Sequence, residues 1–249
     1  MNNTDIIDAK NRIDMATVNP ISYYYSAALT NDNNIAYINV NQALNDKFIG
    51  SITEAQFFMV AEESEQIFIL NKKLIIKTII EAKEKPDFIF VCNLSAKWFI
   101  DEIRFQEFER LIADLPKNIC FSLSTSSLSK LSFEVKDKMN TYFKEKGLMI
   151  MLDNPEEDKL SLIFEIKLAY IRLDGRYYKN HCNQKTGFLR LYQDFARAHQ
   201  ILVSVNHVDD EGNRVFFKNS GLSIMEGNAI LTPKNKLIAI TAPFELKNK

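Results

Sequence analysis

Apolar and polar residues follow each other in short blocks along this chain, most clearly between residues 147 and 174. Two apolar runs, 148–152 and 170–173, end in Asp153 and Asp174. A polar turn and an apolar helical pattern over 160–168 lie between them. Strands buried on both faces are continuous apolar runs, and parallel strands need a helical crossover. The pattern therefore predicts strand, loop, helix and strand, with an acid at the end of each strand.

The same succession recurs along the rest of the chain. We predict strands over 23–29, 35–40, 88–92, 118–123, 201–205, 223–225 and 236–244, and helices over 66–84, 133–146, 188–199 and 209–219. Thr53 and Gln56 have the spacing of a capping box, and 41–51 is predicted as a polar loop.

A hairpin followed by repeated strand–helix units is typical of an α/β protein. We predict a (βα)8 TIM-like barrel with an antiparallel first strand, and the alternative is a doubly wound open sheet. Residues 1–20 are polar and are expected to form an N-terminal arm or a short helix, followed by a single domain over 21–249.

Composition and charge exclude several classes of function. Thirty-one Lys and Arg against 32 Asp and Glu give a net charge of -1, which does not indicate a nucleic-acid partner. No run approaches the about 20 apolar residues that span a bilayer, and the N-terminus lacks a secretory segment. Cys92, Cys120 and Cys182 form no C-x-x-C pair. We therefore expect a cytoplasmic, reduced protein without a membrane partner or a zinc site.

Polar residues end most of the predicted strands, and in a barrel these ends meet at one rim. They are Asn39, Asn93, Ser122, Asp153, Asp174, Asn206 and Glu226. Only three are acids, whereas a two-metal phosphodiesterase site needs several anionic ligands around its ions. The rim is poor in charge for that chemistry.

Several segments, in order and spacing, resemble the EAL domain, the cyclic-di-GMP phosphodiesterase module of bacteria. The resemblance covers about residues 20 to 235 and is carried by TEAQFFMVAEESEQIFILNKKLI (53–75), VCNLSAKWF (91–99), GLMIMLDN (147–154), YIRLDGRYY (170–178) and GLSIMEGNAILTP (221–233). It implies the same barrel with an antiparallel first strand.

The resemblance also implies where the family's site residues would lie. The signature glutamate falls on Asn39, or two positions later, where there is no glutamate either. The metal-binding asparagine matches Asn93, and the next glutamate falls on Ser122. The paired aspartates fall on Asp153 and Asn154, the water-activating lysine on Arg172, the late glutamate pair on Asn206 and Asp209, and the closing glutamine on Glu226.

Of six family acids in this correspondence, Asp153 and Asp209 remain acidic. Arginine is a poor substitute for an adjustable lysine amine because its pKa stays above about 12. Three acids, Glu156, Glu157 and Asp158, follow Asp153 where a dianionic dinucleotide would approach. These losses predict no metal cofactor, and they disfavour cyclic-di-GMP binding.

The hypothesis is a catalytically inactive EAL-like protein that acts in bacterial signalling by binding a protein, whose identity the sequence does not give. The alternatives are a weak phosphodiesterase, in which Asn93, Asp153 and Asp209 hold Mg²⁺ or Mn²⁺, and a cyclic-di-GMP receptor without hydrolysis. Tyrosines at 23–25 and 177–178 leave room for a homodimer, since tyrosine is enriched at interfaces.

Each site residue also has a plainer structural interpretation. Asp153 is expected to accept from a nearby backbone N–H, and Asn93 to hydrogen bond at its strand end. Asp174 is expected to pair with Arg172 or Arg176, and His207 to be a loop residue. His181 and His199 have no nucleophilic partner in the sequence pattern.

Overall fold

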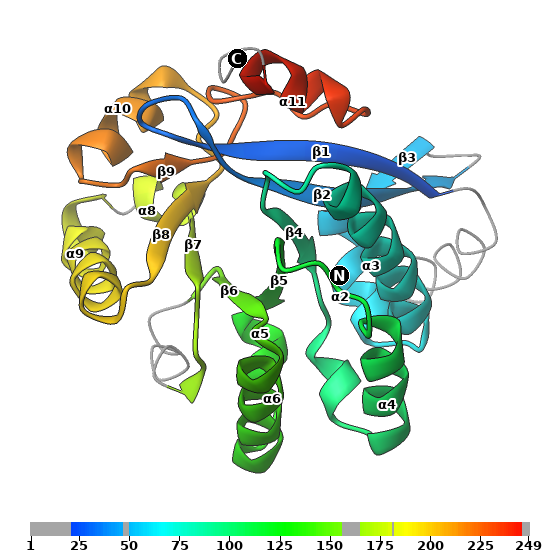
Figure 1. The fold of residues 1–249 in the computed structure, drawn as a ribbon. Helices are drawn as coiled ribbons and strands as arrows, with labels where there is room; N and C mark the ends of the chain where they lie inside the picture. The colour runs from blue at the N-terminus through cyan, green and yellow to red at the C-terminus, as the bar shows by residue number, and fades with distance from the viewer. Residues whose placement is uncertain (1–20, 47–49, 156–164, 181, 246–249) are drawn as a thin grey trace.

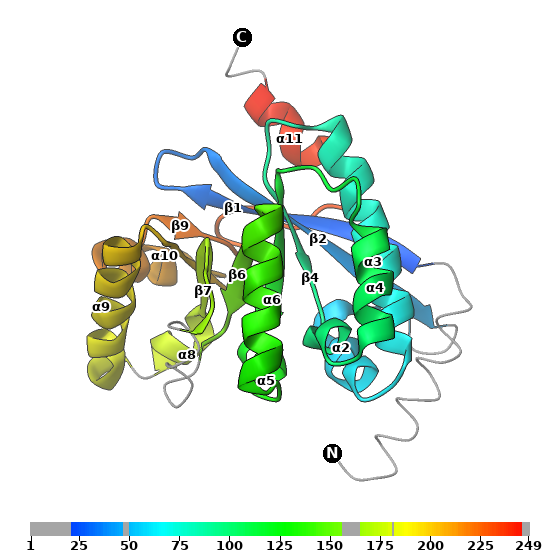
Figure 2. The ribbon, with the colours of Figure 1, turned by 60° about the horizontal axis from the view of Figure 1, so that its bottom comes forward.

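The computed structural model describes all residues except 1–20, 47–49, 156–164, 181 and 246–249. Its strands form one sheet that curls on itself, with helices on the outside (Figures 1 and 2). In the described part of the chain eight strands close the barrel in the order β1-β9-β8-β7-β6-β5-β4-β2, because β2 also pairs with β1. The (βα)8 barrel is thereby confirmed, and the doubly wound open sheet is not what forms.

The first strand is antiparallel to both of its neighbours, as the sequence predicted, and the following barrel strands are parallel. The strands are β1 (Ile21–Thr30), β2 (Ile35–Asp46), β3 (Gly50–Thr53), β4 (Phe90–Asn93), β5 (Ile119–Ser124), β6 (Met149–Asp153), β7 (Tyr170–Asp174), β8 (Leu202–Asn206) and β9 (Ile224–Met225). The short β3 lies outside the barrel, on the free edge of β2.

The helices lie between successive strands and cover the barrel (Figure 1). They are α2 (Glu54–Glu62), α3 (Gln66–Glu84), the 3-10 turn η1 (Ala96–Phe99), α4 (Glu102–Leu111), α5 (Thr125–Leu128), α6 (Phe133–Lys146), α8 (Gly175–Asn180), α9 (Cys182–His199), α10 (Glu211–Asn219) and α11 (Ile238–Glu245). No helix in the described ranges combines the length and apolarity needed to cross a membrane.

Local sequence signals fix the best-predicted helices. α3 and α6 begin and end at the predicted residues. Pro86 follows α3 and cannot continue it, and Gly147 ends α6 in the left-handed conformation with φ of 65°. At the start of α2 the predicted capping box forms, since the Gln56 side chain accepts from the Thr53 N–H at 2.9 Å.

The loop predicted over 41–51 is wrong. β2 continues to Asp46 and pairs with β1 on one side and β3 on the other. Its polar residues are stabilised by specific partners: Gln42 is buried, its side chain donates to the Leu70 carbonyl, and its backbone N–H donates to Glu54. Buried polar groups with partners do not show in a hydrophobic pattern.

The terminal strand predicted over 236–244 is also wrong, because α11 forms there. Leu237, Ile240 and Thr241 are buried whereas Ile238 is exposed, which is the helical spacing i, i+3 and i+4 rather than alternation. The β-branched composition concealed that period. The helix predicted over 160–168 falls mostly on 156–164, outside the described residues.

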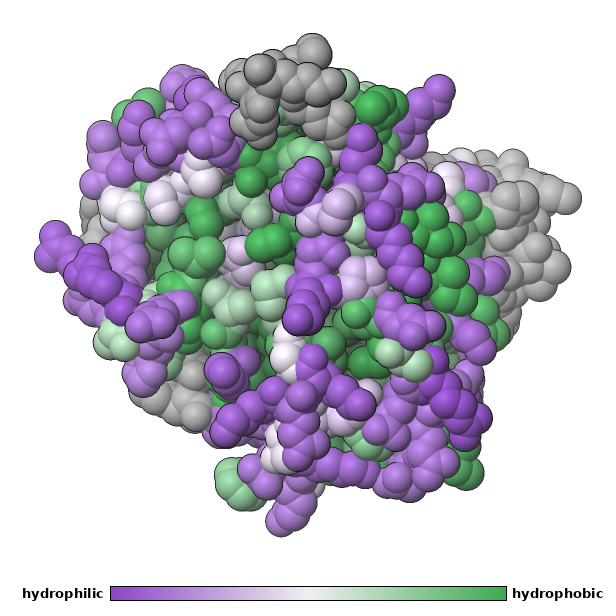
Figure 3. All heavy atoms as spheres, in the orientation of Figure 1, coloured by the Kyte–Doolittle hydropathy of each residue, from purple (hydrophilic) through white to green (hydrophobic). Residues whose placement is uncertain are grey.

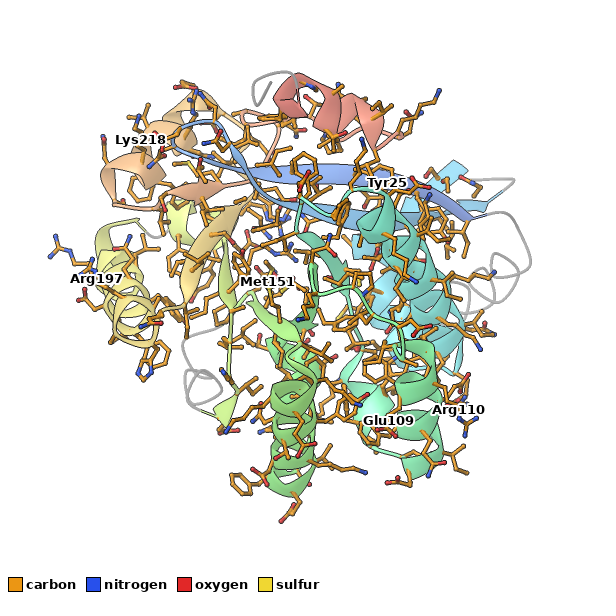
Figure 4. All side chains as sticks on the ribbon, in the orientation of Figure 1. Tyr25, Glu109, Arg110, Met151, Arg197 and Lys218 are labelled. Atoms are coloured by element: carbon orange, nitrogen blue, oxygen red, sulfur yellow. The ribbon has the colours of Figure 1, made fainter. Side chains whose placement is uncertain are left out.

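Apolar side chains form two layers, one on each side of the sheet. The larger lies between strands and helices, and the smaller fills the barrel interior with Ala28, Tyr37, Val91, Cys120, Met151, Tyr170 and Ile224. Met151 points into the barrel, whereas Arg197 points outward from α9 (Figure 4). Cys92 and Cys120 are buried as free thiols, which confirms their interpretation as small hydrophobes.

Candidate functional site

The candidate site is the polar layer directly above the apolar barrel interior. Successive side chains of a strand point to opposite faces, so the residue two positions after an interior residue also points inward. Steps of two lead from Tyr37 to Asn39, from Val91 to Asn93, from Cys120 to Ser122, from Met151 to Asp153, from Tyr170 to Arg172 and from Ile224 to Glu226. On the antiparallel β1 the step runs backward, from Ala28 to Ser26.

Arg172 lies at the centre of this layer and is buried. Its Nε and Nη2 donate to the two carboxylate oxygens of Asp153 at 2.7 and 2.9 Å. Nη1 donates to Asn39 Oδ1 at 2.8 Å, and Nη2 also reaches Ser122 Oγ at 3.3 Å. The guanidinium thus holds together residues from β2, β5 and β6.

A second chain of hydrogen bonds links the same residues to Glu226. Asn39 Nδ2 donates to Ser26 Oγ at 3.2 Å, and the Ser26 hydroxyl donates to Glu226 Oε1 at 2.6 Å. The other carboxylate oxygen of Glu226 lies 3.8 Å from Arg172 Nη1. The network therefore closes on itself around one cation and two carboxylates.

The electrostatics follow from this packing. Burial alone would lower the pKa of Arg172, but the neighbouring Asp153 carboxylate, and then Glu226, hold that pKa well above its ordinary value. Tyr24 borders the network, and burial, with the charges of Glu54 and Glu226, raises its pKa to about 12. The central cation is permanently charged, and the nearby phenol stays protonated at neutral pH.

Glu54 is an acid of this site that the sequence pattern did not reveal. It is the first residue of α2 and is buried, with its oxygens accepting from the Gln42 N–H at 2.9 Å and from Asn93 Nδ2 at 3.0 Å. Burial raises the pKa of Glu54 to about 7 although both hydrogen bonds oppose the shift. An acid in the first turn of a helix ordinarily faces solvent, so no local signal pointed inward.

The remaining polar residues of the rim lie around this network. Asp174 accepts from the guanidinium of Arg176 at 2.8 and 3.1 Å, one of the two predicted pairings. Burial opposes it, but the hydrogen bonds of Arg176 lower the pKa of Asp174 below its ordinary value. Asp209 accepts from both the backbone and the side-chain amide of Asn228 at 3.0 Å.

Two rim residues have backbone conformations that favour glycine. Asn154 and His207, each directly after a barrel strand, have φ of 49° and 54°. The Asn154 N–H donates to the Arg172 carbonyl at 2.8 Å, which fixes this turn to β7. His207 is a rim loop residue, as expected, and His199 stacks near Phe195 on α9 with 4.3 Å between ring centroids. His181 lies outside the described residues.

All nine positions singled out in the sequence line one open cleft of about 490 Å³, together with Tyr24, Ser26, Glu54, Phe58 and Arg176. The expectation that Asp153 accepts from a backbone N–H is wrong, since its carboxylate engages Arg172 at two points. Within the described residues no three His, Cys, Asp or Glu side chains converge in a way that could hold a metal ion.

Comparison with known proteins places this cleft in a family. The model of the EAL domain matches residues 17–233. No curated protein sequence matches the chain. An EAL domain protein of Listeria monocytogenes EGD-e superposes with a TM-score of 0.77 at 12% identity, covering 99% of this chain and 98% of that one. The FimX EAL domain of Pseudomonas aeruginosa, bound to c-di-GMP, gives 0.76 at 14%, covering 93% and 97%.

The EAL enzyme Bd1971 in its cAMP-bound form gives a TM-score of 0.77 at 16% identity and covers 92% of this chain. The chain spans about two thirds of the length of the Bd1971 structures. At these identities structural likeness shows the fold alone. The family model, which covers most of the sequence, adds the assignment: the chain belongs to the EAL domain family.

Proposed function

We propose that this chain is a catalytically inactive EAL domain that acts in bacterial signalling by binding another protein, without hydrolysing cyclic di-GMP. The observation that carries the proposal is Arg172, whose guanidinium lies among the residues that correspond to the family's metal ligands and donates to three of them.

A divalent cation does not fit this arrangement. Mg²⁺ and Mn²⁺ need oxygen ligands whose negative charge is free, and Asp153 already shares its charge with Arg172 at two points. A metal at the same oxygens would meet a buried positive charge whose pKa is raised well above its ordinary value. Neither deprotonation of Arg172 nor its rotation into solvent relieves that repulsion cheaply.

The same residue bears on activation of water. A guanidinium that stays protonated donates hydrogen bonds but does not accept a proton from water. In the described site the carboxylates nearest to it are both engaged, Asp153 with Arg172 and Glu226 with Ser26. The chemistry that the layer supports is therefore structural: one fixed cation neutralises the acids and joins the strands.

The weak-phosphodiesterase alternative would need Asn93, Asp153 and Asp209 to hold the cations together. Each has a protein partner in the structure: Asn93 donates to Glu54, Asp153 pairs with Arg172, and Asp209 accepts from Asn228. The receptor alternative has one supporting observation, which is the open cleft of about 490 Å³ with Tyr24 and Arg176 in its lining.

The test is a hydrolysis assay with cyclic di-GMP and either Mg²⁺ or Mn²⁺, followed by calorimetric titration of cyclic di-GMP in calcium. An EAL phosphodiesterase assayed in parallel provides the positive control. We expect no turnover and no saturable heat. Metal-dependent hydrolysis that is lost in Asp153→Asn would overturn the proposal, and binding without turnover would establish the receptor function instead.

A further inference from the structure

Helix α3 presents a row of apolar side chains to the outside of the barrel. Ile67, Leu70, Leu74 and Ile75 are buried on its inner face. Ile69, Ile76 and Ile80 lie on the opposite face and are 45%, 43% and 47% exposed. Large apolar residues singly exposed on a surface are ordinary, but three on one helix face form a patch.

The three isoleucines lie on one line along the helix. At about 100° per residue, the spacings of seven and four residues place them within roughly 40° of one another. Lys72 and Lys83 fall on one side of this line, and Lys73 and Lys77 on the other. Apolar surface bordered by hydrophilic side chains lies over α3, at the right of Figure 3. We call Ile69, Ile76, Ile80 and these four lysines the α3 ridge.

The ridge is open to a partner along its length. α3 lies on the outside of the barrel between α2 and α4, and the neighbouring helices pack against its sides (Figures 1 and 2). Lys72 pairs with Glu107 of α4 at 3.4 Å, and Lys77 pairs with the buried Glu81. Glu84, in the last turn, is exposed. The four lysines still outnumber these three acids and lie nearer to the isoleucines than Glu81 does.

We propose that the α3 ridge docks an amphipathic helix of a partner protein whose apolar stripe is flanked by acidic residues. The spacing of the isoleucines matches the alternating four and three residues of a helix–helix seam, and the flanking lysines specify acids on the other side. A second copy of this chain fits poorly, because antiparallel pairing of two ridges sets lysine rows against lysine rows. The inference rests on the proposed function, since it names the chemistry of the protein that the domain binds.

The probe is a set of three labelled helical peptides of 19 residues, the length of α3. All three carry leucine along one seam, and they differ in having Glu, Gln or Lys at the flanking positions. We expect the order of affinity Glu, Gln, Lys, with binding of the Glu peptide weakened by salt. Equal affinity for the three peptides, or no binding of the Glu peptide, overturns the inference.

Variants then locate the binding site. Ile76→Ser with Ile80→Ser is expected to weaken binding of the Glu peptide at least about tenfold. The matched control is Leu191→Ser with Val215→Ser, at apolar residues of α9 and α10 that are 48% and 47% exposed, and it should bind as the parent does. Thermal melting establishes that both double variants are folded. Equal weakening in the control overturns the location.

A second double variant separates charge from apolar contact. Lys72→Gln with Lys83→Gln should reduce the preference for the Glu over the Gln peptide while retaining most of the affinity for the Gln peptide. Binding to phosphatidylglycerol vesicles through the isoleucines, without peptide binding, would make the ridge a membrane contact and overturn the proposal. Self-association that is lost in Ile76→Ser with Ile80→Ser would make it a dimer interface, which also overturns it.

The two proposals fail separately. Hydrolysis of cyclic di-GMP would remove the proposed inactivity and would leave a peptide-binding ridge in place. Absence of both hydrolysis and peptide binding would leave the inactive barrel standing and remove the ridge.

Discussion

Asp153 and Arg172 are register partners on adjacent parallel strands, and their side chains form a two-point ion pair across that register. The pair is buried in the barrel mouth, and Arg172 continues from it to Asn39 and Ser122. Charge-assisted bonds of this geometry are among the stronger hydrogen bonds in proteins. An internal side-chain cation therefore organises the layer in which the family places its metal ligands.

Removing the central cation should destabilise the fold. In Arg172→Met the carboxylates of Asp153 and Glu226 lose their counter-charge, and we expect a loss of about 2–4 kcal/mol in the free energy of unfolding. Arg176→Met is the matched control because Arg176 pairs with Asp174 but its side chain is 63% exposed, so we expect less than about 1 kcal/mol. Urea unfolding measures both, and equal losses would contradict the central role of Arg172.

Stability should fall as pH rises from 5 to 8 because of Glu54. Its pKa is raised by burial to about 7 in the fold, so between its unfolded pKa and 7 the folded protein binds the proton more tightly. The stabilisation is complete at acidic pH and is lost as pH passes through 7. We expect a contribution on the order of 2 kcal/mol between pH 5 and 8.

Glu54→Gln should remove most of that pH dependence. An amide can accept from the Gln42 N–H and donate to Asn93 after the Asn93 amide has turned over, so the variant keeps two hydrogen bonds. Glu63→Gln, at an exposed glutamate near the end of the same helix, is the control and should keep the parent's profile. Unfolding midpoints at several pH values measure the effect, and parallel profiles for the parent and Glu54→Gln would refute it.

The closing loop of the barrel depends on Gly227, next to Glu226. A Cβ there would lie 2.4 Å from the backbone N and O of Val208, and the φ of 150° is strained for other residues. We expect Gly227→Ala to cost more than about 2 kcal/mol. Gly187→Ala, in α9 with no atom near the added Cβ, should instead stabilise by roughly 0.5–1 kcal/mol. A tolerated Gly227→Ala would show that the loop can shift.

Local signals made much of the fold predictable from the sequence. Capping at Thr53, Pro86 after α3 and Gly147 after α6 gave helix boundaries that the structure confirms. The extension of β2 past Val40 was missed because Gln42 is polar, and only tertiary contacts with Leu70 and Glu54 account for its burial.

The site was predictable in its membership and not in its bonding. Period-two alternation puts Asp153 and Arg172 on the inward face of their strands, but the register that makes them partners is set by the whole sheet. Glu54 reaches the site only because β3 carries the start of α2 back beside β2. No pattern within α2 distinguishes that glutamate from an ordinary first-turn acid.

The most direct measurement is titration of Mn²⁺ into the purified parent and Asp153→Asn, by calorimetry and by thermal melting. If Arg172 takes the place of a metal, neither protein binds Mn²⁺ saturably at concentrations up to about 1 mM, and the metal shifts neither melting temperature. Saturable binding in the parent, with a melting shift that disappears in Asp153→Asn, would show that Arg172 yields to a metal and would contradict the inactive-site account.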